Sequence, residues 1–336
     1  MALLPEPRLR HLDDQTGLTV FQYDKMAPGR QFCDVVLAKA RFELTPEGIS
    51  RSARPAELCL ADTHRNADDP LGSSLAQAGD LIVGKPGADI YVSGLARRAQ
   101  PARYWAVSVT LGPQAQPLAH YECAATGPRH WRHSLLSGWQ LSETEPTQAV
   151  PIEYELSYGG SKPDSKKPAD EWQRFEPNPS GTGFSFDHYP RDQTPAAPQW
   201  ESASVFASLK SKELVGLGPV ARFWTSRKQF IGTYDEAWQR EQLKDGVIAD
   251  YPADFDLRFF QCATPSCKPP HRSRATRRCT SKGCCRQPPR SVPGYRAWRC
   301  WLRWVQRERR AISKCACRSI PCTSIWKKTS SSWSGG

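Results

Sequence analysis

Acidic side chains are almost absent from the C-terminal part of this 336-residue sequence. Residues 266–336 contain one acid, Glu308, and 18 Lys and Arg, so this segment has a net charge of +17. The preceding 265 residues contain 28 basic and 33 acidic side chains and are net −5. The net charge of +12 therefore describes a tail, and the sequence divides into a mildly acidic body, 1–265, and a basic tail, 266–336.

The body also lacks long apolar runs and paired cysteines. Its N-terminus has no apolar stretch of the kind a signal peptide needs, and no run approaches the length of a membrane span. Cys33, Cys59, Cys123 and Cys262 are far apart, which is typical of reduced, incidental thiols and not of a disulfide framework or a zinc site. These absences predict a cytoplasmic protein without a membrane span, a metal or a cofactor.

Motifs of catalytic chemistry are scarce as well. There is no Gly-x-Ser-x-Gly elbow. Residues 79–86 resemble a phosphate-binding loop, but Pro86 replaces the Ser or Thr that would bind magnesium. Proline also lacks a backbone donor and disfavours a helix at Lys85, so a strand, a turn and a second strand from Asp89 are the simpler interpretation.

Two pairs of side chains keep an enzyme open as an alternative. His130 and His133 are three residues apart, although no carboxylate lies near them in the sequence. Asp254 and Asp256 would share one face of a strand, where pairing with Arg258 is favoured over metal binding or catalysis. A hydrolase would require the two histidines and the two aspartates to meet in one deep pocket.

The apolar pattern predicts a mainly β (α+β) fold of antiparallel sheets, with a few short helices, long loops and a disordered tail. The clearest strand is 104–111, where Trp105, Val107, Val109 and Leu111 alternate with other residues. Further strands are expected at 35–44, 90–93, 118–123 and 152–158. Helices are expected at 204–214 and at 236–243, the latter with Asp235 as its cap and Trp238 on its buried side. Residues 159–198 read as one irregular excursion and a candidate binding loop.

Seven short motifs occur in an order that resembles a known bacterial family, the domain of unknown function 2169. They are Lys85-Pro86-Gly87-Ala88-Asp89, Gly127-Pro128-Arg129-His130-Trp131, Tyr158-Gly159-Gly160, Asn178-Pro179-Ser180-Gly181-Thr182-Gly183-Phe184, Gly218-Pro219, Gly232-Thr233-Tyr234-Asp235 with Trp238, and Asp254-Phe255-Asp256-Leu257-Arg258-Phe259-Phe260. The resemblance covers most of 1–265, and its motif residues are candidates for structure or partner contact.

The resemblance implies a function in type VI secretion. Members of the family occur beside type VI secretion genes and are implied to be cytoplasmic adaptors or chaperones. They would help to load a toxic effector, often one with a PAAR tip domain, onto the VgrG spike. No catalytic activity, catalytic residue or cofactor comes with the resemblance.

The tail departs from this pattern after Pro265. It contains no Asp, Asn, Phe or Met and is rich in residues with GC-rich codons. Codons chosen for 278–285 and reread from the third base give Leu-His-Ile-Glu-Gly-Leu-Leu-Pro, so we expect a frameshift product or a gene-model artefact from about Ser266. The alternative is a nucleic-acid-binding arm, because tryptophans at 298–304 are interleaved with arginines. The irregular cysteine spacing does not fit a zinc ribbon.

Overall fold

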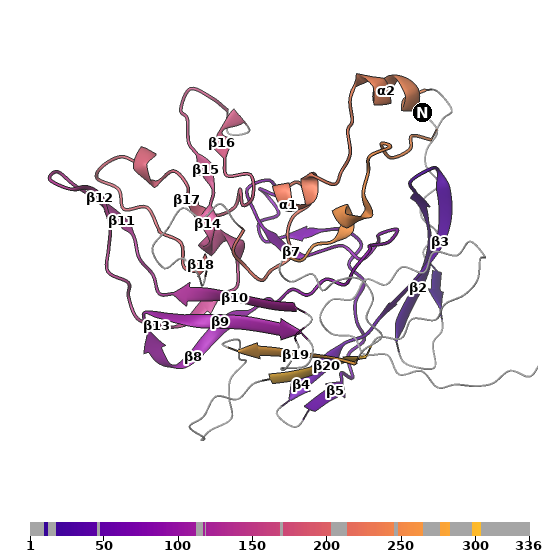
Figure 1. Ribbon diagram of the computed structural model, residues 1–336, viewed down its shortest axis with the longest axis horizontal. Helices are drawn as coiled ribbons and strands as arrows, with labels where there is room; N and C mark the ends of the chain where they lie inside the picture. Colours follow the sequence, from indigo (N-terminus) through magenta and orange to yellow (C-terminus); the bar gives the residue numbers. More distant parts are fainter. Residues whose placement is uncertain are drawn as a thin grey trace, which may run out of the picture.

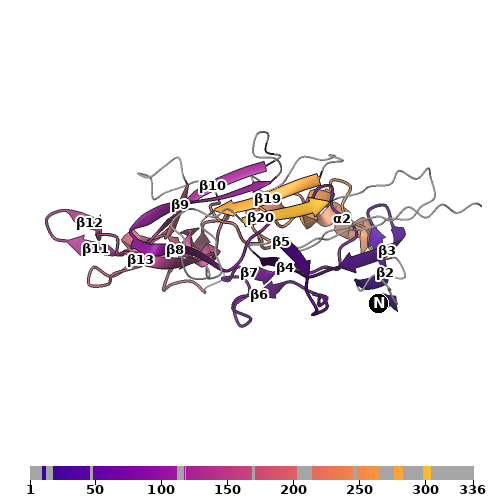
Figure 2. The ribbon, with the colours of Figure 1, turned by 90° about the horizontal axis from the view of Figure 1, so that it is seen from below.

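The structure of the protein is a computed structural model. It describes residues 10–12, 18–45, 48–111, 117, 119–168, 171–202, 214–244, 248–264, 276–282 and 298–303. In these segments the chain is mainly β, as the apolar pattern predicts, and almost all of its strand pairs are antiparallel. Figure 1 shows the arrangement of the strands, and Figure 2 shows that the described body is flat.

A five-stranded antiparallel sheet lies at the centre (Figure 1). Its strands, in spatial order, are β18 (Trp200–Ser202), β10 (Ala119–Thr126), β9 (Tyr104–Leu111), β19 (Thr276–Lys282) and β20 (Trp298–Arg303). Strands β9 and β10 confirm two strands that the sequence predicts. β19 and β20 come from the basic tail: β19 pairs with β9, and β20 pairs with β19. The rest of the tail lies outside the described residues.

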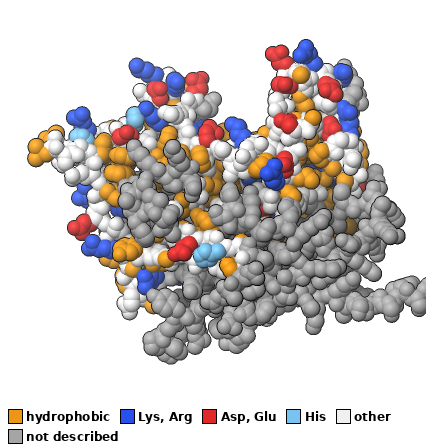
Figure 3. Space-filling view, in the orientation of Figure 1, with side chains coloured by type: hydrophobic (Ala, Val, Ile, Leu, Met, Phe, Trp, Pro, Cys, Tyr) orange, Lys and Arg blue, Asp and Glu red, His pale blue; other side chains and the backbone are white. Residues whose placement is uncertain are grey.

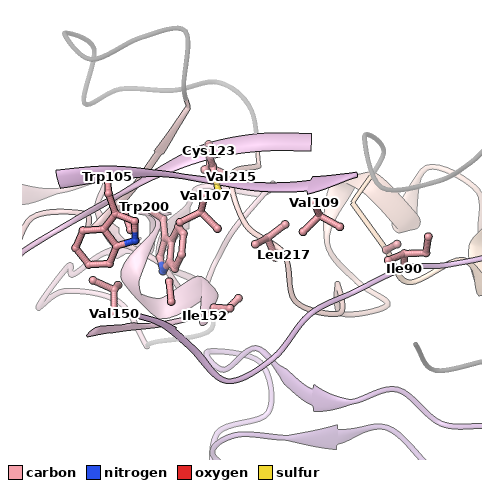
Figure 4. Packing of buried hydrophobic residues seen from close by; sticks show 13 residues of the cluster. Ile90, Trp105, Val107, Val109, Cys123, Val150, Ile152, Trp200, Val215 and Leu217 are labelled. Carbon is pink, nitrogen blue, oxygen red and sulfur yellow. The ribbon is translucent and has the colours of Figure 1, made fainter. Parts of the chain in front are cut away.

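The main hydrophobic core lies against one face of this sheet (Figure 4). Trp105, Val107 and Val109 of β9 are all buried, which confirms the predicted alternation. They pack with Trp200 of β18 and with Leu217 from a loop. Because every second residue of a strand faces the same side, this short sequence supplies three core side chains at once.

A second sheet holds the other end of the molecule together. It consists of β1 (Arg10–Leu12), β2 (Thr19–Ala27) and β3 (Gln31–Lys39), all antiparallel. Its buried side chains, including Tyr23 and Val35, pack against residues near the end of the body. The single strand expected at 35–44 is broken after Lys39.

Six two-stranded units complete the fold. They are β4 (Phe42–Thr45) with β5 (Gly48–Arg51), β6 (Thr63–His64) with β7 (Leu75–Gln77), β8 (Leu95–Ala102) with β13 (Thr147–Pro151), β11 (Trp131–Ser134) with β12 (Gly138–Leu141), β14 (Tyr158–Gly159) with β17 (Thr182–Gly183), and β15 (Ser161–Lys162) with β16 (Gln173–Arg174). The β14–β17 pair is parallel. Most of 159–198 is irregular between these short strands, as predicted.

Helices are short. The described residues contain α1 (Thr225–Lys228), α2 (Glu236–Gln242), and the 3₁₀ turns η1 (Tyr154–Leu156), η3 (Phe186–His188) and η4 (Leu257–Phe260). The predicted helix at 236–243 is confirmed by α2, whose cap is Asp235. The helix expected at 204–214 lies almost wholly outside the described residues.

Several predicted strands are wrong. Residues 90–93 form a loop, and 152–158 contain the 3₁₀ turn η1 at Tyr154–Leu156, with only Tyr158 in a strand, β14. Both segments carry buried isoleucines, Ile90 and Ile152, which pack into the main core. A loop that crosses a core buries apolar residues much as a strand does, so the sequence pattern alone does not distinguish them. The strand expected before the turn at Lys85 is likewise a loop. In the part of the chain that the structure describes, no helix has the length and apolarity of a membrane span.

Candidate functional site

The buried carboxylate of Asp89 links the motif at 85–89 to the residues that directly follow the motif at 254–260. Lys85 Nζ lies 2.9 Å from Asp89 Oδ2, and both side chains are buried. The other donors to Asp89 are the backbone N–H groups of Cys262 at 2.9 Å and Ala263 at 3.2 Å, together with the Cys262 thiol at 3.6 Å. Pro86 and Gly87 form the bend that brings Lys85 back to Asp89. Asp89 therefore joins two loops that are more than 170 residues apart.

The ionisation of this site suits a structural role. Burial raises the pKa of the Asp89 carboxyl, but the Lys85 ammonium and the two backbone donors outweigh burial and leave this pKa below its usual value. Burial and the neighbouring Asp89 raise the pKa of the Cys262 thiol to about 12. Cys262 is thus held as a neutral thiol at physiological pH, which is unfavourable for a nucleophile.

A small cavity of about 20 Å³, lined by both charged and apolar residues, lies beside this junction. It is large enough for about one water molecule. Its charged lining residues include Asp62 and Arg222, joined at 2.7 Å, and Asp80, whose carboxylate lies 2.6 Å from the ammonium of Lys39. Lys85, from the near-match to a phosphate loop, also lines it. Lys85 and Asp80 form ion pairs here, Lys85 with Asp89 and Asp80 with Lys39.

Arg227 of α1 extends the same network. Its Nε donates to the Phe259 carbonyl at 2.9 Å and its Nη1 to the Val220 carbonyl at 2.7 Å. Burial lowers the pKa of the guanidinium, and Asp62 and Asp89 partly oppose this. Sequence reasoning missed Asp62, Asp80 and Arg227 because their partners are distant in the chain and no local pattern marks them.

The motifs at 158–160 and 178–184 lie together in a second junction, which we call the glycine clasp. The N–H of Gly160 donates to the Asn178 carbonyl at 2.9 Å, and the N–H of Phe184 donates to the Gly159 carbonyl at 3.0 Å. Asn178 is fully buried, and its Nδ2 donates to the carbonyls of Tyr154 and Tyr158. The clasp fastens the irregular excursion to the body through backbone atoms.

Aromatic rings and the remaining glycines pack around the glycine clasp. The Tyr158 and Phe175 rings meet edge to face, and Phe184 lies beside Phe175. Burial, and to a lesser extent the charge of Asp187, raises the pKa of Tyr158. Gly183, with φ +90°, packs against the Pro198 ring. Pro179, Gly181 and Thr182 complete the loop between these contacts.

The motif at 127–131 anchors a hairpin. Arg129 is buried, donates through Nε and Nη2 to the Pro198 carbonyl, and pairs with the buried Glu201. Trp131 stacks on Phe186, with ring centroids 3.9 Å apart and planes 9° apart. Strands β11 and β12 continue from this base and project from one end of the body (Figures 1 and 2).

The tip of the hairpin is apolar and exposed. Leu135 and Leu136, between β11 and β12, are 92% and 99% exposed. Figure 3 shows hydrophobic side chains at the outer end of the hairpin. Sequence reasoning missed this feature, although Ser137-Gly138 between two tryptophans is a turn signal.

The motif at 232–235 pairs with the one at 254–258. Asp254 accepts hydrogen bonds from the backbone N–H and hydroxyl of Thr233, at 2.9 and 2.8 Å, and these lower its pKa. Asp256 caps η4 and pairs with Arg258 at 2.6 Å, which lowers its pKa. The Asp256–Arg258 pair is confirmed. The expected strand at 254–256 is wrong, because the chain turns into η4.

The other residues of these motifs form turns and cap a helix. Gly232, with φ +83°, faces Pro252, and Asp235 accepts from the Trp238 N–H at 2.8 Å to cap α2. The rings of Tyr234 and Trp238 are in edge contact, and Trp238 is partly buried. At 218–219, the Gly218 carbonyl accepts from the Tyr154 hydroxyl at 2.9 Å, and Pro219 is buried beside it.

The four side chains that a hydrolase would use do not meet. His130 precedes β11 and His133 lies within it, at the hairpin end of the molecule (Figure 1). Asp254 and Asp256 lie with Thr233 and Arg258, on the α2 side. No group of three or more His, Cys, Asp or Glu side chains within the described segments is arranged to hold a metal ion.

Comparison with known proteins gives a family. Residues 29–319 match the family described as an uncharacterized protein conserved in bacteria (DUF2169), so the match continues past Pro265 into the basic tail. No curated protein and no solved structure matches the chain. Because the match covers well over half of the sequence, the chain belongs to the DUF2169 family of bacteria.

Proposed function

We propose that the protein is a non-catalytic cytoplasmic adaptor or chaperone of type VI secretion. It would bind a toxic effector with a PAAR domain and help to load it onto the VgrG spike. The family motifs suggest this function, because the resemblance that they carry implies adaptors. The partners in this proposal are proteins, with no specific nucleic acid and no membrane.

The observation that carries the proposal is the use of the motif side chains. Asp89, Asn178 and Arg129 are buried and hold distant loops together, and Asp254 and Asp256 stabilise turns. An enzyme family is expected to keep titratable side chains around an open pocket. Motifs that instead fix loops support a scaffold that presents a surface to another protein.

Co-purification tests this function. The tagged full-length chain is co-expressed with a PAAR-domain effector encoded in the same bacterial genome, alone and together with VgrG. We expect the effector to elute with the chain in stoichiometric amounts, and an effector of another secretion system, without a PAAR domain, to be absent. Failure to retain the PAAR effector at any salt concentration would contradict the proposal.

The basic tail supports a second candidate, binding of nucleic acid. Its net charge of +17 favours contact with phosphates, and such binding weakens steeply as salt increases. Removal of the residues after Pro265 would abolish nucleic-acid binding while leaving effector binding intact. The same purification separates the two candidates through the ultraviolet absorbance ratio of the eluted complex.

A further inference from the structure

The leucines at the hairpin tip have no role within the described fold. Leu135 and Leu136 are almost fully exposed, and neither belongs to a hydrophobic core cluster. The turn itself needs only its small polar residues, since Gly138 supplies the positive φ of +66° and the Ser134 hydroxyl accepts from the Leu136 N–H. Turns of this kind usually carry Gly, Asn, Asp or Ser, so two adjacent leucines call for another explanation.

The hairpin is fixed in place at its base. Trp131 of β11 stacks on Phe186, which is 55 residues further along the chain. Trp139 of β12 meets the edge of Phe186, with centroids 6.2 Å apart, and also meets His133 at 5.3 Å. A tip held by packed aromatic rings loses little conformational freedom on binding, which favours affinity.

The charge of the hairpin is opposite to that of the body. Residues 123–142 contain no Asp or Glu, whereas residues 1–265 are net −5. Arg132 of β11 is exposed, and the only other arginine of this stretch, Arg129, is already paired with Glu201. A partner surface that is acidic around an apolar hollow is therefore attracted to the hairpin.

We propose that the hairpin tip, defined as Leu135, Leu136 and Arg132, is the surface that binds the effector. The two leucines enter an apolar groove of the effector protein, and Arg132 pairs with a carboxylate at the rim of the groove. This inference rests on the proposed adaptor function and adds to it the contact surface and the chemistry of the partner.

Two other occupants fit the tip less well. In a symmetric dimer of this chain the same surface would meet itself, which brings the two Arg132 side chains together at a contact with only two leucines on each side. A lipid bilayer is also a poor match, because stable membrane binding needs a larger apolar face or several cationic side chains.

The test compares affinities of full-length variants for the purified PAAR effector, measured by biolayer interferometry. The variant L135S/L136S makes the tip polar and keeps a residue type suited to turns. The matched control, L60S/L71S, removes two leucines that are 58% and 56% exposed in loops away from the hairpin. We expect the dissociation constant to rise at least tenfold for L135S/L136S and to stay within twofold for L60S/L71S.

Reversing the charge of Arg132 gives an independent test of the proposed surface. R132E should weaken binding at low salt by at least fivefold, and its effect should shrink in 0.5 M salt, because screening removes the contribution of the ion pair. Unchanged thermal unfolding of each variant shows that the fold is retained. Equal affinities of the wild type and L135S/L136S would overturn the inference while leaving the adaptor function intact.

The remaining outcomes also decide the question. If the wild-type chain does not bind the effector, the adaptor function is wrong and the inference falls with it. Concentration-dependent dimerisation that L135S/L136S abolishes would assign the tip to self-association. Flotation of the wild type, but not of this variant, with phosphatidylglycerol vesicles would assign it to a membrane. Either result overturns the inference.

Discussion

Close backbone contact makes glycine necessary at particular positions of the glycine clasp. A Cβ atom on Gly160 would lie 2.5 Å from the Gly181 carbonyl oxygen, and the φ of Gly160 is +105°. Gly94 has a similar φ of +119°, but a Cβ there would meet nothing within 4 Å. The two positions therefore separate the cost of an unusual φ from the cost of a steric clash.

We expect G160A to destabilise the protein more than G94A. The unfavourable φ alone should lower the free energy of unfolding by about 1–2 kcal/mol in G94A. The clash with Gly181 should add roughly another 1 kcal/mol or more in G160A. Chemical denaturation of both variants checks the difference, and equal losses would show that the clasp relaxes around the new methyl group.

Asp89 gives a prediction of pH dependence. D89N leaves the Lys85 ammonium buried without its counter-ion, which should cost about 3–5 kcal/mol at pH 7. Since the folded pKa of Asp89 lies below the unfolded value of about 3.9, its stabilisation is present above about pH 4 and is lost as pH falls through the folded pKa.

The stability difference between wild type and D89N should therefore be large at pH 7 and shrink towards pH 3. Unfolding by urea at both pH values measures it. D254N is the control, because Asp254 also has a lowered pKa but is exposed, so its substitution should change stability far less. A difference that is the same at pH 3 and pH 7 would contradict the structural role of the Asp89 charge.

At the scale of elements, short helices in this protein depend on their caps. Helix α2 has only seven residues, and Asp235 accepts a hydrogen bond from the Trp238 N–H at its start. Trp238 fastens α2 by donating from its indole Nε1 to the Asp250 carbonyl. A helix of this length gains little from its own backbone bonds, so its cap and its single aromatic anchor decide whether it forms.

D235A should lower the free energy of unfolding by about 1 kcal/mol, the usual value of such a cap. E236A, one residue further on, removes an acid from the same first turn without removing the cap, and should cost only a few tenths of a kcal/mol. Thermal unfolding followed by circular dichroism measures both. An E236A variant as unstable as D235A would point to general charge effects at this helix end.

Local signals explain which elements the sequence predicts. Strand β9 and helix α2 follow from alternation and from a capping residue, both within a few neighbours. The segments 90–93 and 152–158 were wrongly predicted as strands because their backbones bond to distant segments: the Val92 N–H donates to the Leu217 carbonyl and the Ile152 N–H to the Gly94 carbonyl. Nothing in their own segments records those partners.

Site prediction has the same limit. The motifs supplied candidate residues, but they did not predict that Asp89 would meet the backbone of Cys262 or that Asn178 would meet Tyr154. The pair Asp256–Arg258 was predictable because the two residues are neighbours in sequence. The hairpin tip was missed because exposed leucines carry no pattern that distinguishes them from core leucines.

At the scale of the whole molecule, the basic tail decides where the family domain ends. Strands β19 and β20 extend the central sheet beyond β9, and the family match continues to residue 319. The boundary at residue 265 and the frameshift after it stay predictions from composition. Because a shifted frame changes every later residue, the DNA sequence tests them directly.

Resequencing the gene across the Pro265 codon should reveal a missing or additional base close to the Ser266 codon. In the corrected frame, we expect the sequence after Pro265 to regain acidic and apolar residues in ordinary proportion, with far fewer Arg and Cys. If resequencing finds no missing or additional base, so that the present reading frame through residue 336 is correct, the frameshift is contradicted and the tail is a genuine part of the family domain.

The adaptor function that we propose rests on a scaffold whose motif residues hold loops together and whose hairpin tip is exposed. If the proposal is correct, the chain is needed for export of its effector but not for assembly of the secretion apparatus. Deletion of its gene should therefore stop secretion of one effector and leave the secretion apparatus functional.

Secretion of the PAAR effector in a deletion strain tests this claim most directly. We expect the effector to disappear from the culture supernatant when the gene is deleted, while secretion of the VgrG spike continues, and to return when the intact gene is supplied in trans. Undiminished secretion of the effector by the deletion strain would contradict the adaptor function.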